Sequence, residues 1–505
     1  MNHEEKALAS SRPLGVASEL GATELDADAV FAKCVVLTGE HPTLSTRNGQ
    51  WCFLDSLRLL SRVVGVLEVA IPDGLPELER EVELLVPELW SQGTVRRVQP
   101  EQASFSSATA ILNVGCEVRS NLPWTSILAN GWVARCTSGR TALPAPADQD
   151  NPVSCMLAAS FGVTEVFKRV YGVPVDVASP MENVAFSLFE LNNEFQDYGP
   201  QLPTSISLPN TLVLGAGAIG NGLVLLLSQL PLHGRVLLMD KQNFGAENYG
   251  TCTLLDLAEW IGKPKAKMLA NWLRSRSVLE IQDEMSTIET ALDENLFKHP
   301  VNLVINGLDD VAARRAVQKL WPSLLVDGGI NSAGAAVVTY TPVHRKFACL
   351  RCNFKGPNEN AGALQAKATG LNSSSLEGDP NRLITDEDIA KADEPAREWL
   401  REQQRAGKTI CSTISTGMAD RLGLALAKGF RPSVPFVATA SAALVIAQVM
   451  RNLFWPEQKF IHEFQFSSLF VGASTGARTG RLASPDCECT KNSKVIDAII
   501  ASRHG

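Results

Sequence analysis

Apolar runs with the lengths of buried strands alternate along the chain with stretches that have helical spacing. In the second part of the chain, the apolar run at 211–214 leads into helical spacing at 223–230 and then into another apolar run at 236–239. Further strand-like runs follow at 302–306, 324–327 and 335–341. Strands that alternate with helices in this way favour a parallel sheet, so the pattern predicts an α/β fold.

The first part of the chain repeats this order of elements in a weaker form. Its strand-like runs begin at Lys33, Val66, Thr109 and Trp132. Helical spacing occupies 54–64, and an apolar helix predicted at 154–172 matches a second one at 437–454 in its small residues and basic end. We expect a duplicated α/β domain, with two unrelated α/β domains as the alternative.

The composition changes after Cys352, where Gly, Asn and Ser replace large apolar residues. A charged stretch of helix formers at 386–405, interrupted by Pro395, comes next. Such a segment has too few apolar residues for a large core, so we expect a small subdomain or lid over the main domain. The predicted boundaries are a degenerate domain over 1–200 (the first half), a domain built from 201–355 and 430–505 (the second half), and an inserted segment over 356–429.

A glycine-rich turn follows the strand at 211–214, with Gly215, Gly217 and Gly220 in the spacing G-x-G-x-x-G. Glycines allow the backbone to approach phosphates, and the free N–H groups at the start of the following helix attract anions. The next strand ends at Asp240, whose carboxylate can accept hydrogen bonds from a ribose. The motif predicts a nucleotide site but leaves open whether a dinucleotide or another nucleotide binds.

Three polar residues after this turn have no role in a dehydrogenase. Asn248 lies soon after the second strand, Lys265 opens a helix where phosphates could lie, and Asp309 ends a strand where a carboxylate can bind Mg²⁺. The alternatives are Lys263 or Lys267 in place of Lys265, Asp310 in place of Asp309, and a purely structural role for Asp240.

Four thiols occur as two close pairs, Cys349 with Cys352 and Cys487 with Cys489. Two short hairpins that each present two thiolates can form the tetrahedral ligand set of a structural zinc site. The spacing therefore predicts bound Zn²⁺, with free or buried thiols as the alternative.

The composition limits the possible partners and the compartment. The chain has 505 residues, a formal net charge of −8 and 11 cysteines. The negative charge argues against nucleic acid or an anionic membrane as a partner, and the cysteines suggest a reducing cytoplasm. The apolar run near 437–450 contains polar residues and predicts a packed helix, and no signal peptide is visible at the N-terminus.

Taken together, these motifs resemble those of the ubiquitin-activating superfamily, which includes the ThiF/MoeB-like enzymes of sulfur-carrier pathways. The resemblance covers roughly 205–490 and rests on GAGAIG, Asp240, Asn248, GKPK, LDDVAARR at 308–315, and the four thiols. It implies two Rossmann-like ThiF-type adenylation domains, the first degenerate and the second active, with a small inserted segment that carries a catalytic cysteine. Compact bacterial members that serve dedicated ubiquitin-like proteins have a similar length.

The resemblance also implies roles for individual residues. By it, Gly215, Gly217, Gly220 and Asp240 hold ATP, Asn248 and Lys265 contact the triphosphate, and Asp309 binds Mg²⁺. The chain departs from the family at Thr251, where an arginine usually follows the asparagine. Arg274, Arg12 or Arg47 would have to substitute for it, or adenylation would be weak.

Cys411 lies where thioester-forming members carry their transfer cysteine, and the resemblance makes it the catalytic thiol. Lys408 and the start of a helix expected over 418–428 would stabilise its thiolate. The alternative is a small buried side chain.

The expected function is therefore ATP-dependent activation of a ubiquitin-like protein through its C-terminal carboxylate. A thioester would form on Cys411 and pass to a conjugating enzyme, and homodimer formation is a further expectation. The alternatives are an adenylyltransferase for a sulfur-carrier protein that forms no thioester, a silent scaffold that binds a ubiquitin-like protein and, distantly, a dehydrogenase.

Overall fold

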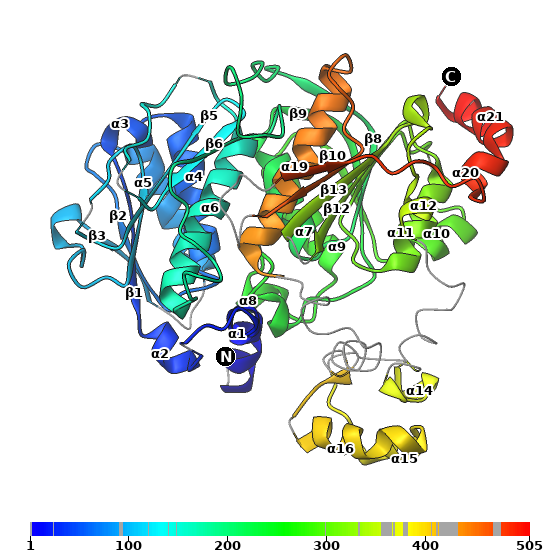
Figure 1. The fold of residues 1–505 in the computed structure, drawn as a ribbon, viewed down its shortest axis with the longest axis horizontal. Coiled ribbons are helices and arrows are strands. Elements are labelled where there is room, and N and C mark those ends of the chain that lie inside the picture. Colours follow the sequence, from blue (N-terminus) through cyan, green and yellow to red (C-terminus); the bar gives the residue numbers. More distant parts are fainter. Residues whose placement is uncertain are drawn as a thin grey trace.

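The computed structural model describes most of the chain. The described residues are 3–23, 25–89, 94–119, 121–139, 141–147, 149–297, 299–331, 334–354, 366, 369–376, 382–405, 407–410, 413, 433–467 and 476–504. Within them two β-sheets lie side by side, with helices between and around them (Figure 1).

The first sheet belongs to the first half of the chain. Its strands are β1 (Cys34–Gly39), β2 (Val66–Ala70), β3 (Thr94–Val98), β4 (Ala110–Val114), β5 (Trp124–Asn130), β6 (Val133–Thr137) and β7 (Val184–Ser187). They are arranged in the order β3-β2-β1-β4-β5-β6-β7. The pairs from β3 to β5 are parallel, and β6 and β7 pair antiparallel.

The second sheet repeats this topology and adds one strand. Its strands are β8 (Ile206–Leu214), β9 (Leu232–Met239), β10 (Glu280–Glu284), β11 (Leu303–Asn306), β12 (Leu324–Asn331), β13 (Gly334–Tyr340), β14 (Glu463–Phe466) and β15 (Gly476–Thr479). The order is β10-β9-β8-β11-β12-β13-β14-β15, parallel as far as β12 and antiparallel beyond it. The shared strand order and directions confirm the predicted pair of Rossmann-like halves.

Helices are present near the four stretches predicted from their spacing, 54–64, 154–172, 223–230 and 437–454, whereas several of the other helices were not predicted. The longer helices are α1 (His3–Glu19), α4 (Arg47–Leu60), α5 (Pro76–Leu85), α6 (Pro152–Tyr171), α7 (Ala218–Gln229), α9 (Lys265–Arg274), α19 (Pro435–Phe454) and α21 (Ser493–His504). The shorter ones are α2 (Ala27–Phe31), α3 (His41–Leu44), α8 (Leu257–Trp260), α10 (Ile288–Asp293), α11 (Val311–Val317), α12 (Leu350–Asn353) and α20 (Glu488–Lys491). Helix α4 starts earlier than expected, because Thr46 caps its N-terminus by accepting a hydrogen bond from the Gly49 amide.

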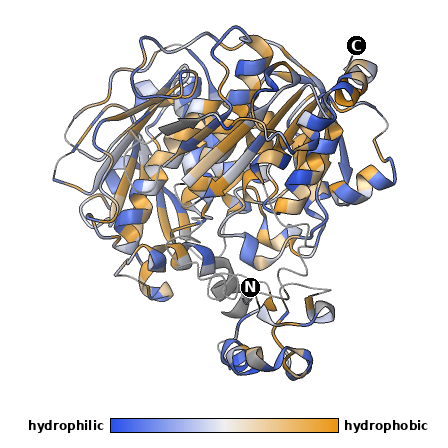
Figure 2. Cartoon of the chain, turned by 45° about the vertical axis from the view of Figure 1, so that its right-hand side comes forward, coloured by the Kyte–Doolittle hydropathy of each residue, from blue (hydrophilic) through white to orange (hydrophobic). Residues whose placement is uncertain are grey.

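Helices α6 and α19 pack against each other between the two sheets (Figure 1). The Ser160 and Thr439 hydroxyls lie 2.9 Å apart, and the rings of Phe167 and Phe436 are 5.2 Å apart at their centroids. A single cluster of buried apolar side chains extends through both halves. Figure 2 shows the hydropathy along the chain, with hydrophobic residues in the strands and helices of both halves. A large apolar interface of this kind favours one rigid body over independent domain motion.

Helix α19 is long and apolar enough to cross a membrane, but 89% of its most apolar window is buried inside the protein. It is therefore the packed helix that the sequence predicts.

The inserted segment contains α14 (Ser373–Leu376), α15 (Asp386–Lys391) and α16 (Arg397–Arg405). Pro395 lies in a 3₁₀ turn, η6 (Glu394–Ala396), between α15 and α16, as its position predicts. These elements share a small apolar cluster of their own and lie below the two sheets in Figure 1 rather than over them. Cys411 and the helix expected over 418–428 lie outside the described residues.

Candidate nucleotide site and cysteine cluster

The glycine turn joins β8 directly to the start of α7. Gly215 has a φ of +86°, which glycine adopts without strain, and a Cβ on Gly220 would lie 2.0 Å from the Gly215 carbonyl oxygen. Gly217 occupies the N-cap position of α7, and no described side chain caps this helix. Its first N–H groups are therefore available to an anion, as the sequence predicts.

Asp240 follows β9 and ties its end to the glycine turn. One carboxylate oxygen accepts a hydrogen bond from the Ala216 amide at 2.7 Å, and the other accepts one from the Gln242 amide at 2.8 Å. A carboxylate has further acceptor positions, so these two bonds still allow one from a ribose hydroxyl. Asp240 thus has a structural role that is compatible with the predicted binding role.

Lys265 is the first residue of α9 and is only 5% exposed. Its ammonium donates a hydrogen bond to the Gln242 side-chain oxygen at 2.9 Å and lies 5.8 Å from the centroid of the Phe244 ring. Lys263 and Lys267 are exposed. Burial therefore singles out Lys265 among the three lysines, and Gln242 links it to Asp240.

Asn248 ends the short turn η3 (Ala246–Asn248). Its side-chain oxygen accepts a hydrogen bond from the Gly245 amide at 3.0 Å, which leaves the side-chain NH₂ as the group that could donate to a phosphate. Thr251 donates a hydrogen bond to the Asn248 carbonyl at 3.1 Å. Thr251 therefore supports the loop that carries Asn248.

The three arginines considered as substitutes at Thr251 have different surroundings. Arg274 pairs with Asp283 at 2.6 Å and also donates to the Ile281 carbonyl. Arg47 lies over the Trp51 ring in the first half. Arg12 is exposed on α1, and α1 packs against η3. Of the three, Arg12 is therefore on the element that contacts the Asn248 turn.

Asp309 and Asp310 differ in what their carboxylates do. Asp310 is the N-cap of α11 and accepts a hydrogen bond from the Ala313 amide at 2.7 Å. Asp309 is exposed and has no hydrogen-bond or ionic partner among the described residues. Since β11 and β8 are parallel neighbours, Asp309 follows the same edge of the sheet as the glycine turn. These contacts favour Asp309 as the free carboxylate for Mg²⁺.

Sequence reasoning missed a buried ion pair behind Asp309. Arg314 lies 3.3 Å from the Asp327 carboxylate and donates a hydrogen bond to the Leu308 carbonyl at 2.6 Å. Asn306 donates to the same carboxylate at 2.5 Å. Burial raises the pKa of Asp327 to about 6, although Arg314 and Asn306 act to lower it. An acidic residue at the end of the apolar run LLVD was the available signal.

The corresponding turn in the first half is closed. Glu40 accepts a hydrogen bond from the Glu117 amide, and a Cβ on Gly115 would lie 2.5 Å from the Glu40 side chain. Thr46 caps α4, so the helix that corresponds to α7 has one of its free N–H groups occupied. An acidic side chain beside a capped helix disfavours phosphate, which fits the predicted degeneracy of this half.

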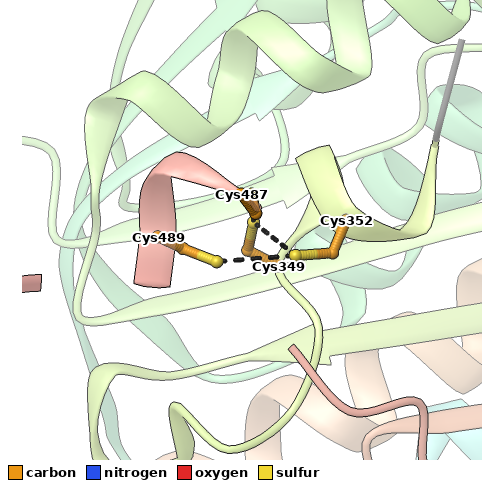
Figure 3. Close-up of side chains that lie close together, drawn as sticks. All are labelled: Cys349, Cys352, Cys487 and Cys489. Carbon is orange, nitrogen blue, oxygen red and sulfur yellow. Dashed lines mark hydrogen bonds between the residues drawn. The ribbon is translucent and has the colours of Figure 1, made fainter. Parts of the chain in front are cut away.

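The four predicted metal ligands form a compact cluster (Figure 3). The sulfur of Cys349 lies 3.7 Å from those of both Cys352 and Cys487, and the sulfur of Cys352 lies 3.4 Å from that of Cys489. All four sulfurs lie within 4.8 Å of one another. Four thiolates at tetrahedral positions around Zn²⁺ would have sulfurs about 3.8 Å apart, so the donor set fits this ion.

Neighbouring backbone groups support this cluster. The Ser484 amide donates to the Cys352 sulfur at 3.4 Å, as expected for a thiolate. The Leu350 amide donates to the Gln318 side chain at 3.0 Å. The cluster therefore connects α20, near the C-terminus, to the region of α11.

We expect purified protein to contain about one zinc ion per chain, and the double variant Cys349→Ser/Cys352→Ser to lose it. Because metal binding contributes to folding, this variant should lose about 3 kcal/mol or more of unfolding free energy. Elemental analysis and thermal unfolding measure the two effects. Cys116→Ser, in the first half, is the control and should keep its zinc. Full zinc content in the double variant would contradict the assignment.

Comparison with known protein families gives one match that covers more than half of the chain. Residues 189–490 match the ThiF family. An uncharacterized protein of Sinorhizobium fredii, y4jF, is 26% identical over 258 residues, which are 50% of this chain and 48% of that protein. The chain thus spans about half the length of the curated relative that it matches. Structures of Escherichia coli MccB are distantly similar. The structure with ATP has a TM-score of 0.35 and 13% identity, over 57% of this chain and 66% of that one. Because the family match covers more than half of the sequence, the chain belongs to the ThiF family.

Proposed function

We propose that the chain binds ATP with Mg²⁺ and adenylates the C-terminal carboxylate of a ubiquitin-like protein. The observation that carries this proposal is the uncapped start of α7, with Asp240 and Lys265 joined beside it through Gln242. Membership of the ThiF family, which has an adenylation fold, supports the same activity.

The proposed roles follow from the donors and acceptors at the site. The N–H groups at the start of α7 and the Lys265 ammonium would bind phosphate oxygens, and Asp240 would accept a hydrogen bond from the ribose. Asn248 would donate to the triphosphate. Asp309 would hold Mg²⁺, an ion that neutralises charge on phosphate oxygens during phosphoryl chemistry.

In the proposed first step, a carboxylate oxygen of the partner attacks the α-phosphorus of ATP. The bond from that phosphorus to the bridging oxygen breaks, and pyrophosphate leaves with the electron pair. Lys265, which is buried and already oriented by Gln242, would stabilise the negative charge that develops on the phosphate oxygens.

In the proposed second step, the Cys411 thiolate attacks the acyl carbon and AMP leaves, which gives a thioester. The thioester then passes to a cysteine of a conjugating enzyme. Cys411 lies outside the described residues, so this step rests on its position in the sequence. A reducing compartment such as the cytoplasm would keep the thiol available. We also propose the domain boundaries given by the sequence and the formation of a homodimer.

ATP–pyrophosphate exchange with candidate partners tests adenylation. Exchange that depends on a partner ending in glycine is the expected result. No exchange with a partner that binds the chain would favour a silent scaffold, which the departure at Thr251 makes the second candidate.

Cys411→Ala should retain this exchange and lose a partner adduct that reductant cleaves, since only the second step needs the thiol. Denaturing gel electrophoresis without reductant measures the adduct, and Cys116→Ala is the matched control. An adduct that persists in Cys411→Ala would instead favour an adenylyltransferase for a sulfur-carrier protein that forms no thioester on this residue.

A further inference from the structure

We propose that Arg62, from the first half, positions the glycine turn of the second half through a single peptide group. The inference rests on the proposed nucleotide binding and assigns a role to a residue outside the site. Arg62 follows α4, is 2% exposed, and donates a hydrogen bond to the Thr253 carbonyl at 2.8 Å. It contacts the second half in the loop that begins at Asn248.

The contact between the halves at this point is reciprocal. The Arg62 guanidinium lies 4.1 Å from the centroid of the Tyr249 ring, a distance suited to a cation–π interaction. The Tyr249 hydroxyl in turn donates a hydrogen bond to the Ser61 carbonyl at 3.3 Å. Tyr249 directly follows Asn248, so the first half holds both ends of the 249–253 segment.

The other side of the same peptide group leads to the glycine turn. Thr253 provides the carbonyl that Arg62 binds, and Leu254 provides the N–H, which donates to the side-chain oxygen of Asn221 at 3.1 Å. Asn221 is fully buried and donates to the carbonyls of Ala216 at 3.1 Å and Gly217 at 2.9 Å. A continuous series of hydrogen bonds therefore runs from Arg62 to the turn.

This series explains how the turn is held open for phosphate. Asn221 binds the carbonyl oxygens of the turn, which keeps those electronegative atoms away from an incoming anion. The backbone N–H groups at the start of α7 then remain the polar groups offered to the ligand. Within the described part of the chain Arg62 reaches the turn through this peptide and does not touch it directly, so it is a positioning residue.

If Arg62 served packing alone, burying its guanidinium would lower the stability of the fold. Its Nε and Nη1 atoms are buried and have no hydrogen-bond partner among the described residues. A buried guanidinium with unsatisfied N–H groups loses hydration without full compensation, and a methionine of similar length would avoid that loss. Among the described residues, the one hydrogen-bond partner of the guanidinium is the Thr253 carbonyl.

Calorimetric titration of the full chain with ATP and Mg²⁺ tests the inference in a double-mutant cycle. Arg62→Met and Asn221→Ala should each raise the Kd for ATP about tenfold, since a small misplacement of binding groups is enough to cause such a loss. The double variant should bind no more weakly than the weaker single variant, because both substitutions break one series of contacts. Arg62→Lys should lie between wild type and Arg62→Met.

Arg58→Met is the matched control. Arg58 also lies on α4 at the interface between the halves, but it faces Glu88 at 3.7 Å and the Trp272 ring at 5.7 Å. The Arg58→Met variant should have a lower unfolding temperature, but its Kd for ATP should stay within about twofold of wild type. Equal effects of Arg58→Met and Arg62→Met, or additive losses in the double variant, would overturn the inference.

Two further outcomes are decisive. If Arg62→Met does not fold, Arg62→Lys is compared with wild type instead. An unchanged Kd for ATP in Arg62→Lys then overturns the inference. If the wild-type chain binds no ATP, the proposed function fails and the inference fails with it, whereas ATP binding that is insensitive to Arg62 leaves the proposed function standing.

Discussion

Replacing Gly217 by valine is expected to lower the affinity for ATP about 100-fold or more and leave the unfolding temperature unchanged. No described atom lies within 4 Å of a Cβ built on Gly217, and its φ of −78° is accessible to any residue. The new side chain would therefore fit the protein and occupy the space in front of α7. Loss of two charge-assisted hydrogen bonds to phosphate, at about 1.5–3 kcal/mol each, gives the expected size of the effect. Calorimetric titration and thermal unfolding measure it.

Gly220→Ala is the contrasting variant. Its Cβ would lie 2.0 Å from the Gly215 carbonyl oxygen, a backbone atom that cannot move without distorting the turn. We expect a loss of about 2–4 kcal/mol of unfolding free energy together with weaker ATP binding. If Gly217→Val bound ATP as tightly as wild type, the start of α7 would not be the phosphate site.

Asp309→Asn is expected to reduce the rate of adenylation about 100- to 1,000-fold with little change in stability. The carboxylate has no partner among the described residues, so its loss leaves no buried group unsatisfied. A metal ion that stabilises charge in the transition state contributes several kcal/mol, which sets the scale of the loss. Pyrophosphate exchange across a Mg²⁺ titration measures the effect, and excess Mg²⁺ should restore part of the rate.

Asp310→Ala provides a control from the next residue. It removes the N-cap of α11 and should cost about 1 kcal/mol of unfolding free energy while the rate stays within a few-fold of wild type. A larger loss of rate in Asp310→Ala than in Asp309→Asn would indicate that Asp310, and not Asp309, binds Mg²⁺.

Local sequence patterns were enough to predict the elements that position the nucleotide site. The apolar run of α19 is confirmed from Pro435 to Phe454, and the strand before the glycine turn and the helix after it lie where the pattern places them. The strands β3, β5, β7, β10, β14 and β15 were not predicted. Of these, β3 and β10 are edge strands rich in charged residues, so they lack the apolar runs that indicate a buried strand.

Contacts between distant residues could not be read from the sequence. Arg62 and Thr253 are 191 positions apart, and the carboxylate of Asp327 meets Arg314 only because the second sheet brings β12 next to β11. The thiols are an instructive exception. Cys349 and Cys487 are 138 positions apart, yet their paired spacing predicted the cluster, because metal ligation imposes a recognisable pattern on each hairpin.

The predicted roles differ in how far the structure supports them. It brings Asp240 and Lys265 to one site and shows different contacts for Asp309 and Asp310, while the catalytic roles of all four residues stay predictions. Cys411 lies outside the described residues, and its role stays a prediction from sequence position alone.

The joining of both halves in one polypeptide has a consequence for how the protein behaves at low concentration. An assembly of two separate subunits comes apart on dilution, and each subunit then loses whatever its neighbour supplies. Here the apolar contact of α6 with α19 is intramolecular, so the effective concentration of one half near the other is independent of the amount of protein. The support that the first half gives to the second should therefore persist even when few copies are present in a cell.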